Sequence, residues 1–151
     1  DLIRKKILNI NKKITILSAG CASGAEPYTI AMILDQFHYQ LEGWDITIIA
    51  TDIYDKALDE AKEGVYSKYK LRNLDSSLID KYFQPYEHNY LKLYKIDKAL
   101  KKNIKFFHIN LIKEPFQLGH LQNVDIIFCE NVIIYFNLES IQRLINNFHM
   151  I

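Results

Sequence analysis

The sequence has few of the residues that interrupt or cross-link a chain. Five glycines and three prolines stand among 151 residues, and no stretch rich in glycine, serine or proline divides the chain, so a single domain is expected. The two cysteines, Cys21 and Cys129, are too few and too far apart for a disulfide framework or a zinc site. This cysteine usage favours a reducing, cytoplasmic compartment.

Further absences exclude several classes of function. No apolar run approaches the ~20 residues that cross a bilayer, and the first residues lack the apolar core and cleavage site of a signal peptide. The formal net charge is +1, without a basic stripe, so the composition does not favour a nucleic-acid partner. The five histidines show no metal-ligand spacing, and Ser23 lacks the His and Asp pattern of nucleophilic hydrolysis.

What the chain does contain is an alternation of apolar strands and helical patterns. Strands are predicted at 14–17, 45–51, 90–96, 104–109 and 124–129. Helices are predicted from Pro27, from Asp55 as cap to Gly64, over 73–83, and after Asn137 as cap. The apolar face of the last helix comprises Leu138, Ile141, Leu144, Ile145 and Phe148. Apolar strands separated by helices predict an α/β fold with a mostly parallel sheet covered on both faces.

Polar residues collect where these strands end. The loop 20–26 follows the first strand, Asp52 the second, Asn110 the strand at 104–109, and Glu130 with Asn131 the last. In open α/β sheets, ligands bind beyond the carboxyl ends of the strands, where the strand order reverses. The sequence therefore predicts a ligand site built from these four segments.

The first loop, SAGCASGAEPY (18–28), differs from loops that bind phosphate. Ala22 occupies the second glycine position of the dinucleotide fingerprint, and no Lys-Ser/Thr pair follows. Glu26 at the helix start disfavours a phosphate, so the loop suits a ligand with a cationic end, such as S-adenosylmethionine lying against the glycine turn. Asp52 could accept ribose hydroxyls, and Asn110 could pair with an adenine edge. A tight turn, a helix cap and a turn residue are the alternatives at these positions.

Five segments resemble, in order and spacing, the methyltransferase domain of the CheR family. The segments are SAGCASGAEPYTIAM (18–32), ATDIYDKALDEAKEGVY (50–66), KYF (81–83), IKFFHINL (104–111) and DIIFCENVIIYFN (125–137). Members of this family transfer a methyl group from S-adenosylmethionine to glutamate side chains of chemoreceptors. The resemblance implies a Rossmann-like methyltransferase fold over residues 1–151, with 65–102 as an inserted subdomain that docks a receptor tail in some members.

The resemblance also implies a role for individual residues. The implied cofactor-binding residues are Gly20, Cys21, Ser23, Gly24, Glu26, Asp52, Asn110, Leu111 and Asn131. Tyr135 matches a tyrosine beside the transferred methyl group, and S-adenosylhomocysteine would be the product. The implied substrate is the cytoplasmic domain of a chemoreceptor, whose glutamates would become methyl esters in chemotaxis adaptation. No metal is implied.

Two positions depart from the family pattern. Glu130 stands where the family has an arginine, and Ala25 stands where it has the first glutamate of a Glu-Glu-Pro sequence. An arginine can clamp a carboxylate substrate through two hydrogen bonds, whereas the charge of Glu130 would repel it. The hypothesis weighed against a methyltransferase is therefore a degenerate, non-catalytic CheR-like module that binds the cofactor or a signalling partner.

The extent of the chain gives one more expectation. The helical N-terminal domain of the family and the last strands of its sheet are expected to be absent, which would leave the strand at 124–129 as an exposed edge open to self-association. Methylation of nucleic acid is disfavoured, because residues 130–133 read Glu-Asn-Val-Ile instead of Asn/Asp-Pro-Pro-aromatic. The glycine pattern disfavours a nicotinamide oxidoreductase.

Overall fold

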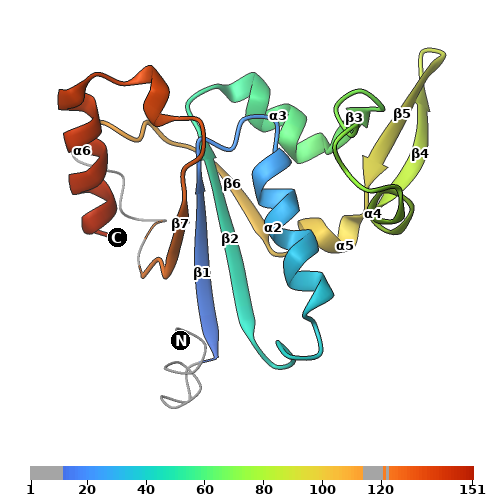
Figure 1. Cartoon of the computed structure of the whole chain (residues 1–151), viewed down its shortest axis with the longest axis horizontal. Coiled ribbons are helices and arrows are strands. Elements are labelled where there is room, and N and C mark those ends of the chain that lie inside the picture. Colours follow the sequence, from blue (N-terminus) through green and yellow to red (C-terminus); the bar gives the residue numbers. More distant parts are fainter. Residues whose placement is uncertain (1–11, 114–120, 122) are drawn as a thin grey trace.

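A computed structural model describes residues 12–113, 121 and 123–151. In that part of the chain, parallel strands form a sheet in the order β6-β2-β1-β7. The strands are β1 (Lys13–Ala19), β2 (Asp45–Asp52), β6 (Ile104–His108) and β7 (Ile126–Phe128). Figure 1 shows that they run in one direction, with their carboxyl ends together at the top of the view. The chain order reverses between β1 and β7, which is where such sheets bind ligands.

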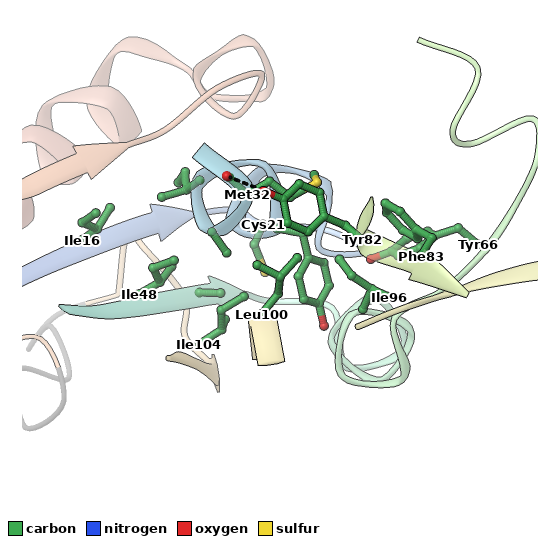
Figure 2. Close-up of a cluster of buried hydrophobic side chains, with 14 of the residues drawn as sticks. Ile16, Cys21, Met32, Ile48, Tyr66, Tyr82, Phe83, Ile96, Leu100 and Ile104 are labelled. Carbon is green, nitrogen blue, oxygen red and sulfur yellow. Dashed lines mark hydrogen bonds between the residues drawn. The ribbon is translucent and has the colours of Figure 1, made fainter. Parts of the chain in front are cut away.

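The register of the strands separates two apolar faces. Ile104, Ile48, Ile16 and Ile126 are aligned across the sheet, and the next residue of each strand points to the opposite face. Figure 2 shows Ile16, Ile48 and Ile104 within the cluster on the first face. On the second face, Leu17 and Ile49 pack in a separate cluster with Leu144. Strands buried on both faces explain the continuous apolar runs in the sequence.

Helices cover both faces, as the sequence predicted. The helices are α2 (Ala25–Gln36), α3 (Asp55–Glu63), α4 (Ser76–Tyr82), α5 (Lys98–Lys101) and α6 (Leu138–His149), with a 3-10 turn, η2 (Ile133–Tyr135). Residues of α2 and α3 pack in the first cluster, and α6 contributes to the second, on the opposite side of the sheet (Figure 1). None of the helices in the described ranges is both long and apolar enough to cross a membrane.

The predicted helix caps are partly correct. The side chain of Asn137 accepts the amide hydrogen of Ser140 at 2.9 Å, and Gly64 ends α3 in the left-handed conformation. Asp55 was wrong as a cap. It is the first residue inside α3, where a carboxylate is favoured by the helix dipole, and Tyr54 takes the cap position.

The predicted apolar face of α6 is only partly covered. Leu144 is fully buried and Phe148 is half-buried in the second cluster. In the described structure, Leu138 is 86% exposed and Ile145 is 52% exposed. The helical period therefore identified the face, and the extent to which neighbouring elements cover it depends on the tertiary fold.

A smaller antiparallel sheet, which we call the small sheet, lies beside the main sheet (Figure 1). It comprises β3 (Val65–Ser67), β5 (Leu91–Ile96) and β4 (Phe83–His88), in the order β3-β5-β4. The sequence predicted β5 but missed β4, because Pro85 argues against a strand. Proline is tolerated here because β4 is an edge strand. The turn at Asn89 and Tyr90 between β4 and β5 was also missed. Both residues have a positive φ, but neither is the glycine that usually signals such a turn.

Candidate cofactor site

A cavity of about 1070 Å³ lies at the carboxyl ends of the parallel strands. Ligand pockets usually measure ~300–1,000 Å³, so this one can hold a nucleoside with an amino-acid tail. The structure brings to this cavity most of the predicted site residues: Gly20, Cys21, Glu26, Asp52, Asn110, Leu111, Glu130, Asn131 and Tyr135. Ser23 and Gly24 do not line it. Their effect on a ligand would act through the loop backbone.

The loop after β1 is held against the end of β2. The amide hydrogens of Gly20 and Cys21 are both donated to the carbonyl of Thr51, each at 2.8 Å. Gly20 and Gly24 have φ of +78° and +92°, a region that favours glycine. A side chain on Gly20 would collide with Val132, and one on Gly24 would press on Tyr28 and Tyr66. These glycines are therefore needed for packing within the protein, and not only for the approach of a ligand as the sequence suggested.

Asp52 fixes the same loop through its carboxylate. Its Oδ2 accepts the amide hydrogen of Ala22 at 2.8 Å, and its Oδ1 accepts that of Tyr54 at 2.9 Å. Ala22 has a φ of +46°, so this hydrogen bond supports a conformation that is costly for a residue with a side chain. Each carboxylate oxygen retains a further lone pair for a ligand hydroxyl.

Glu26 is oriented by a residue that the sequence did not indicate. It stands in the first turn of α2, where the helix dipole stabilises an ionised carboxylate. The hydroxyl of Ser18, which is fully buried, donates to Oε1 of Glu26 at 2.5 Å. The available signal was a serine near the end of a mostly apolar strand, two residues before the glycine turn. This bond leaves the second carboxylate oxygen to face a cation.

Asn110 forms a turn and still has a donor available. Its Oδ1 accepts the amide hydrogen of Ile112 at 3.1 Å, and this bond leaves the NH₂ group able to donate. The next residue, Leu111, is buried, and its carbonyl accepts a hydrogen bond from Nδ2 of Asn147 on α6 at 2.8 Å. The sequence did not indicate Asn147 as a supporting residue. Its contact depends on how α6 packs against Leu111, which lies 36 positions earlier in the chain.

The two thiols remain protonated near neutral pH. Burial raises the pKa of Cys21 to about 12, with the charge of Asp52 as the second cause. Burial also raises the pKa of Cys129, and the charge of Glu26 adds to this effect. Cys21 therefore presents a small, uncharged surface to the cavity.

The remaining wall comes from the segment after β7. Glu130 and Asn131 are exposed there, and Asn131 has a φ of +58°. Tyr135, on η2, is 81% exposed although it lines the cavity. No lysine or arginine is found among the described residues that line this cavity.

The donor set fits a neutral nucleoside with a cationic end. Carboxylates stand at the helix start and at the end of β2, an amide donor follows β6, and the surrounding walls are largely apolar. A phosphate would meet Glu26 and Asp52 and no basic side chain among the described lining residues. The fold and the site together define a Rossmann-like domain of the methyltransferase type.

Comparisons with known proteins agree with this class. The family model of the CheR methyltransferase SAM binding domain matches residues 1–151. The chain belongs to this family, and its cofactor is S-adenosylmethionine.

Similar proteins include named chemotaxis enzymes. The chain is 38% identical to the chemotaxis protein methyltransferase of Borreliella burgdorferi over 97% of its length and 51% of the relative. It is 33% identical to chemotaxis protein methyltransferase 2 of Vibrio cholerae, over 90% of the chain and 46% of the relative. It is 30% identical to the chemotaxis protein methyltransferase of Escherichia coli, over 88% of the chain and 46% of the relative. The chain thus spans about half the length of these relatives.

Proposed function

We propose that this chain is the cofactor-binding part of a protein-glutamate O-methyltransferase that acts on the cytoplasmic domain of chemoreceptors. The observation that carries the proposal is the convergence of Glu26, Asp52 and Asn110 on one largely apolar cavity in a member of the CheR family. Each relative described above is named a chemotaxis protein methyltransferase, which supports the enzyme over the non-catalytic alternative. A cytoplasmic location belongs to the same proposal.

The residues would divide the cofactor between them. Glu26, held by Ser18, would face the ammonium group, and Asp52 would accept the ribose hydroxyls. The free NH₂ group of Asn110 would donate to a ring nitrogen of adenine, beside Leu111. Gly20 and Cys21 line the cavity and would lie along the methionine part of the cofactor. Their amide hydrogens are already donated to the carbonyl of Thr51, so these two amides would not bind the cofactor.

The bound cofactor supplies an electrophilic methyl group on a sulfonium. A glutamate acceptor has an ordinary pKa of ~4.3 and is ionised at neutral pH, so the protein does not need a strong base to activate it. The contribution of the protein would be alignment and exclusion of water. Tyr135 at the cavity opening would position the acceptor, while the charge of the exposed Glu130 would oppose its approach.

Binding is tested by isothermal titration of the chain with S-adenosylhomocysteine and S-adenosylmethionine. The Asp52→Asn variant loses charge-assisted hydrogen bonds worth ~1.5–3 kcal/mol, so its Kd should rise about 10- to 100-fold. Asp55→Asn is the matched control, because Asp55 is an exposed neighbour that pairs with His108 and does not line the cavity. A folded wild-type chain that binds neither ligand would refute the proposed site.

Catalysis is tested in the complete gene product with receptor cytoplasmic domains as substrate. Removing the negative charge in Glu130→Gln should lower KM for the receptor severalfold at unchanged affinity for S-adenosylhomocysteine. Glu42→Gln, an exposed acid outside the cavity, serves as the control. If the wild-type protein binds the cofactor but methylates no receptor, and Glu130→Arg creates activity, the non-catalytic alternative is correct.

A further inference from the structure

The small sheet contacts the proposed cofactor loop through the side chain of Tyr66. This residue belongs to β3, and its hydroxyl donates to the carbonyl of Ser23 at 2.8 Å. Ser23 follows Ala22, whose amide hydrogen is donated to Asp52, and precedes Gly24, which caps α2. The loop is therefore held from two sides, by β2 and by the small sheet.

The ring of Tyr66 is fixed by its neighbours. Tyr66 is 5% exposed and packs edge-on against Tyr28 and Phe83, with ring centroids 6.3 and 6.2 Å away. Figure 2 shows Tyr66 and Phe83 next to each other at one end of the first cluster. Gly24 lies so close that an added side chain would come within 3.1 Å of the Tyr66 hydroxyl. The tyrosine thus has little freedom to move away from the loop.

The hydroxyl of Tyr66 is a permanent donor. Burial raises its pKa far above the ordinary tyrosine range, so the group stays protonated at any working pH. Its acceptor, the carbonyl of Ser23, belongs to a loop whose residues Gly20 to Ala22 line the cavity, although Ser23 does not. Tyr66 can therefore influence a ligand only by fixing the backbone.

We propose that Tyr66 is a positioning residue for the cofactor: its hydroxyl sets the backbone of residues 22–24 and thereby couples the small sheet to the cofactor loop. This inference rests on the proposed cofactor site. Because binding free energies are reciprocal, a ligand held by the loop also stabilises β3, and an event that displaces β3 weakens cofactor binding.

The test compares two single-atom deletions in the aromatic cluster by titration with S-adenosylhomocysteine. Tyr66→Phe removes the hydrogen bond to the loop, and its Kd should rise about 5- to 10-fold while the protein remains folded by circular dichroism. Tyr28→Phe is the matched control. Tyr28 is equally buried, but its hydroxyl donates to Ala61 on α3, so this variant should lose stability without a change in Kd.

Hydrogen exchange gives a readout that does not depend on the variants folding well. In the wild-type chain, S-adenosylhomocysteine should slow exchange at the amides of β3 and of β5, its partner strand. If the wild-type chain binds the ligand and Tyr66→Phe binds it equally well, the inference is refuted. Equal weakening of S-adenosylhomocysteine binding by Tyr66→Phe and Tyr28→Phe would also refute it, and so would unchanged exchange in β3 and β5. A folded wild-type chain that does not bind the ligand refutes the proposed cofactor site itself.

Discussion

Gly20 has a backbone φ of +78°, and its missing Cβ leaves the space that Val132 occupies. Gly43 has nearly the same φ, +76°, but an added Cβ there would only touch the end of Lys12 at an ordinary 3.7 Å. Substitution of Gly43 therefore measures the cost of the left-handed backbone conformation alone. Substitution of Gly20 measures that cost together with the cost of a steric collision.

Gly20→Ala should lower the free energy of unfolding by about 2–4 kcal/mol, because left-handed strain and overpacking add. Gly43→Ala should cost about 1–2 kcal/mol, from the strain alone. Urea denaturation measures both values, and Val132→Ala should recover part of the loss in Gly20→Ala. Equal losses in the two single variants would show that Val132 does not restrict residue 20.

Cys21 allows a prediction on reactivity and pH. With a pKa of about 12, only about one thiol in ten thousand is ionised at pH 8, so Cys21 should resist alkylation in the native state. A Cys129→Ala background isolates Cys21, and mass spectrometry after iodoacetamide treatment, with and without urea, measures its protection. Rapid labelling of the folded chain would contradict the observed burial.

The same pKa fixes the sign of a stability change at alkaline pH. The folded-state pKa of Cys21 lies above the ordinary value of 9.0. The contribution of the buried thiol to the free energy of unfolding is therefore complete below pH 9 and is lost as the pH rises toward 12. In the Cys129→Ala background, the further change Cys21→Ala should flatten this alkaline decline. Urea denaturation at several pH values between 8 and 10.5 measures the difference.

At the scale of elements, α6 offers a test of its N-terminal cap. Asn137→Ala removes the bond to the amide of Ser140 and should cost about 1 kcal/mol of unfolding free energy. Asp75 occupies the cap position of α4 without a side-chain cap hydrogen bond, so Asp75→Ala should cost clearly less. If Asp75→Ala were the more harmful change in urea denaturation, the assignment of the cap would be wrong.

The sequence predicted those elements whose signals are local. The parallel strands followed from apolar runs, and Glu26, Asp52 and Asn110 followed from their places at strand ends. β3 and β4 were missed because β3 has only 3 residues and β4 contains a proline that its edge position tolerates. The local pattern of apolar and polar residues does not indicate which partner strand stabilises such segments.

The supporting residues of the site were missed for a related reason. The side chain of Ser18 bonds to a residue 8 positions away, and that of Tyr66 to one 43 positions away. Neither residue type nor spacing indicates these partners before the strands and helices are placed. The residues proposed to contact the cofactor were predicted from their chemistry, whereas the residues that hold them in place depend on the fold.

At the scale of the whole molecule, the small sheet shares the first cluster with the main sheet. Phe83 of β4 is 7% exposed and packs in the same cluster as Ile16 and Ile48. Both sheets should therefore unfold in one cooperative step. Fluorescence of Trp44, which also packs against this cluster, and far-UV circular dichroism should report the same transition.

Phe83→Ala should lower the unfolding free energy of the entire chain by about 3–5 kcal/mol, because it leaves a cavity in the shared cluster. The Trp44 transition in urea should move with the loss of β-structure, although Trp44 directly precedes β2 and is not part of the small sheet. Tyr90→Ala at the 97% exposed tip of the β4–β5 hairpin is the control and should change little. Separate transitions for the two probes would show that the small sheet unfolds independently.

The strand order also has a consequence for folding. β1 pairs with β2 nearby in the chain, but its other neighbour is β7, where Ile16 lies opposite Ile126. Contacts between residues so far apart in sequence form slowly, because a long loop must close first. During synthesis, β1 emerges from the ribosome well before β7, and its apolar edge stays unpaired for the time needed to translate about a hundred residues. Because Glu130, Asn131 and Tyr135 follow β7 in the chain, the cavity wall that they form is synthesised about a hundred residues later than β1.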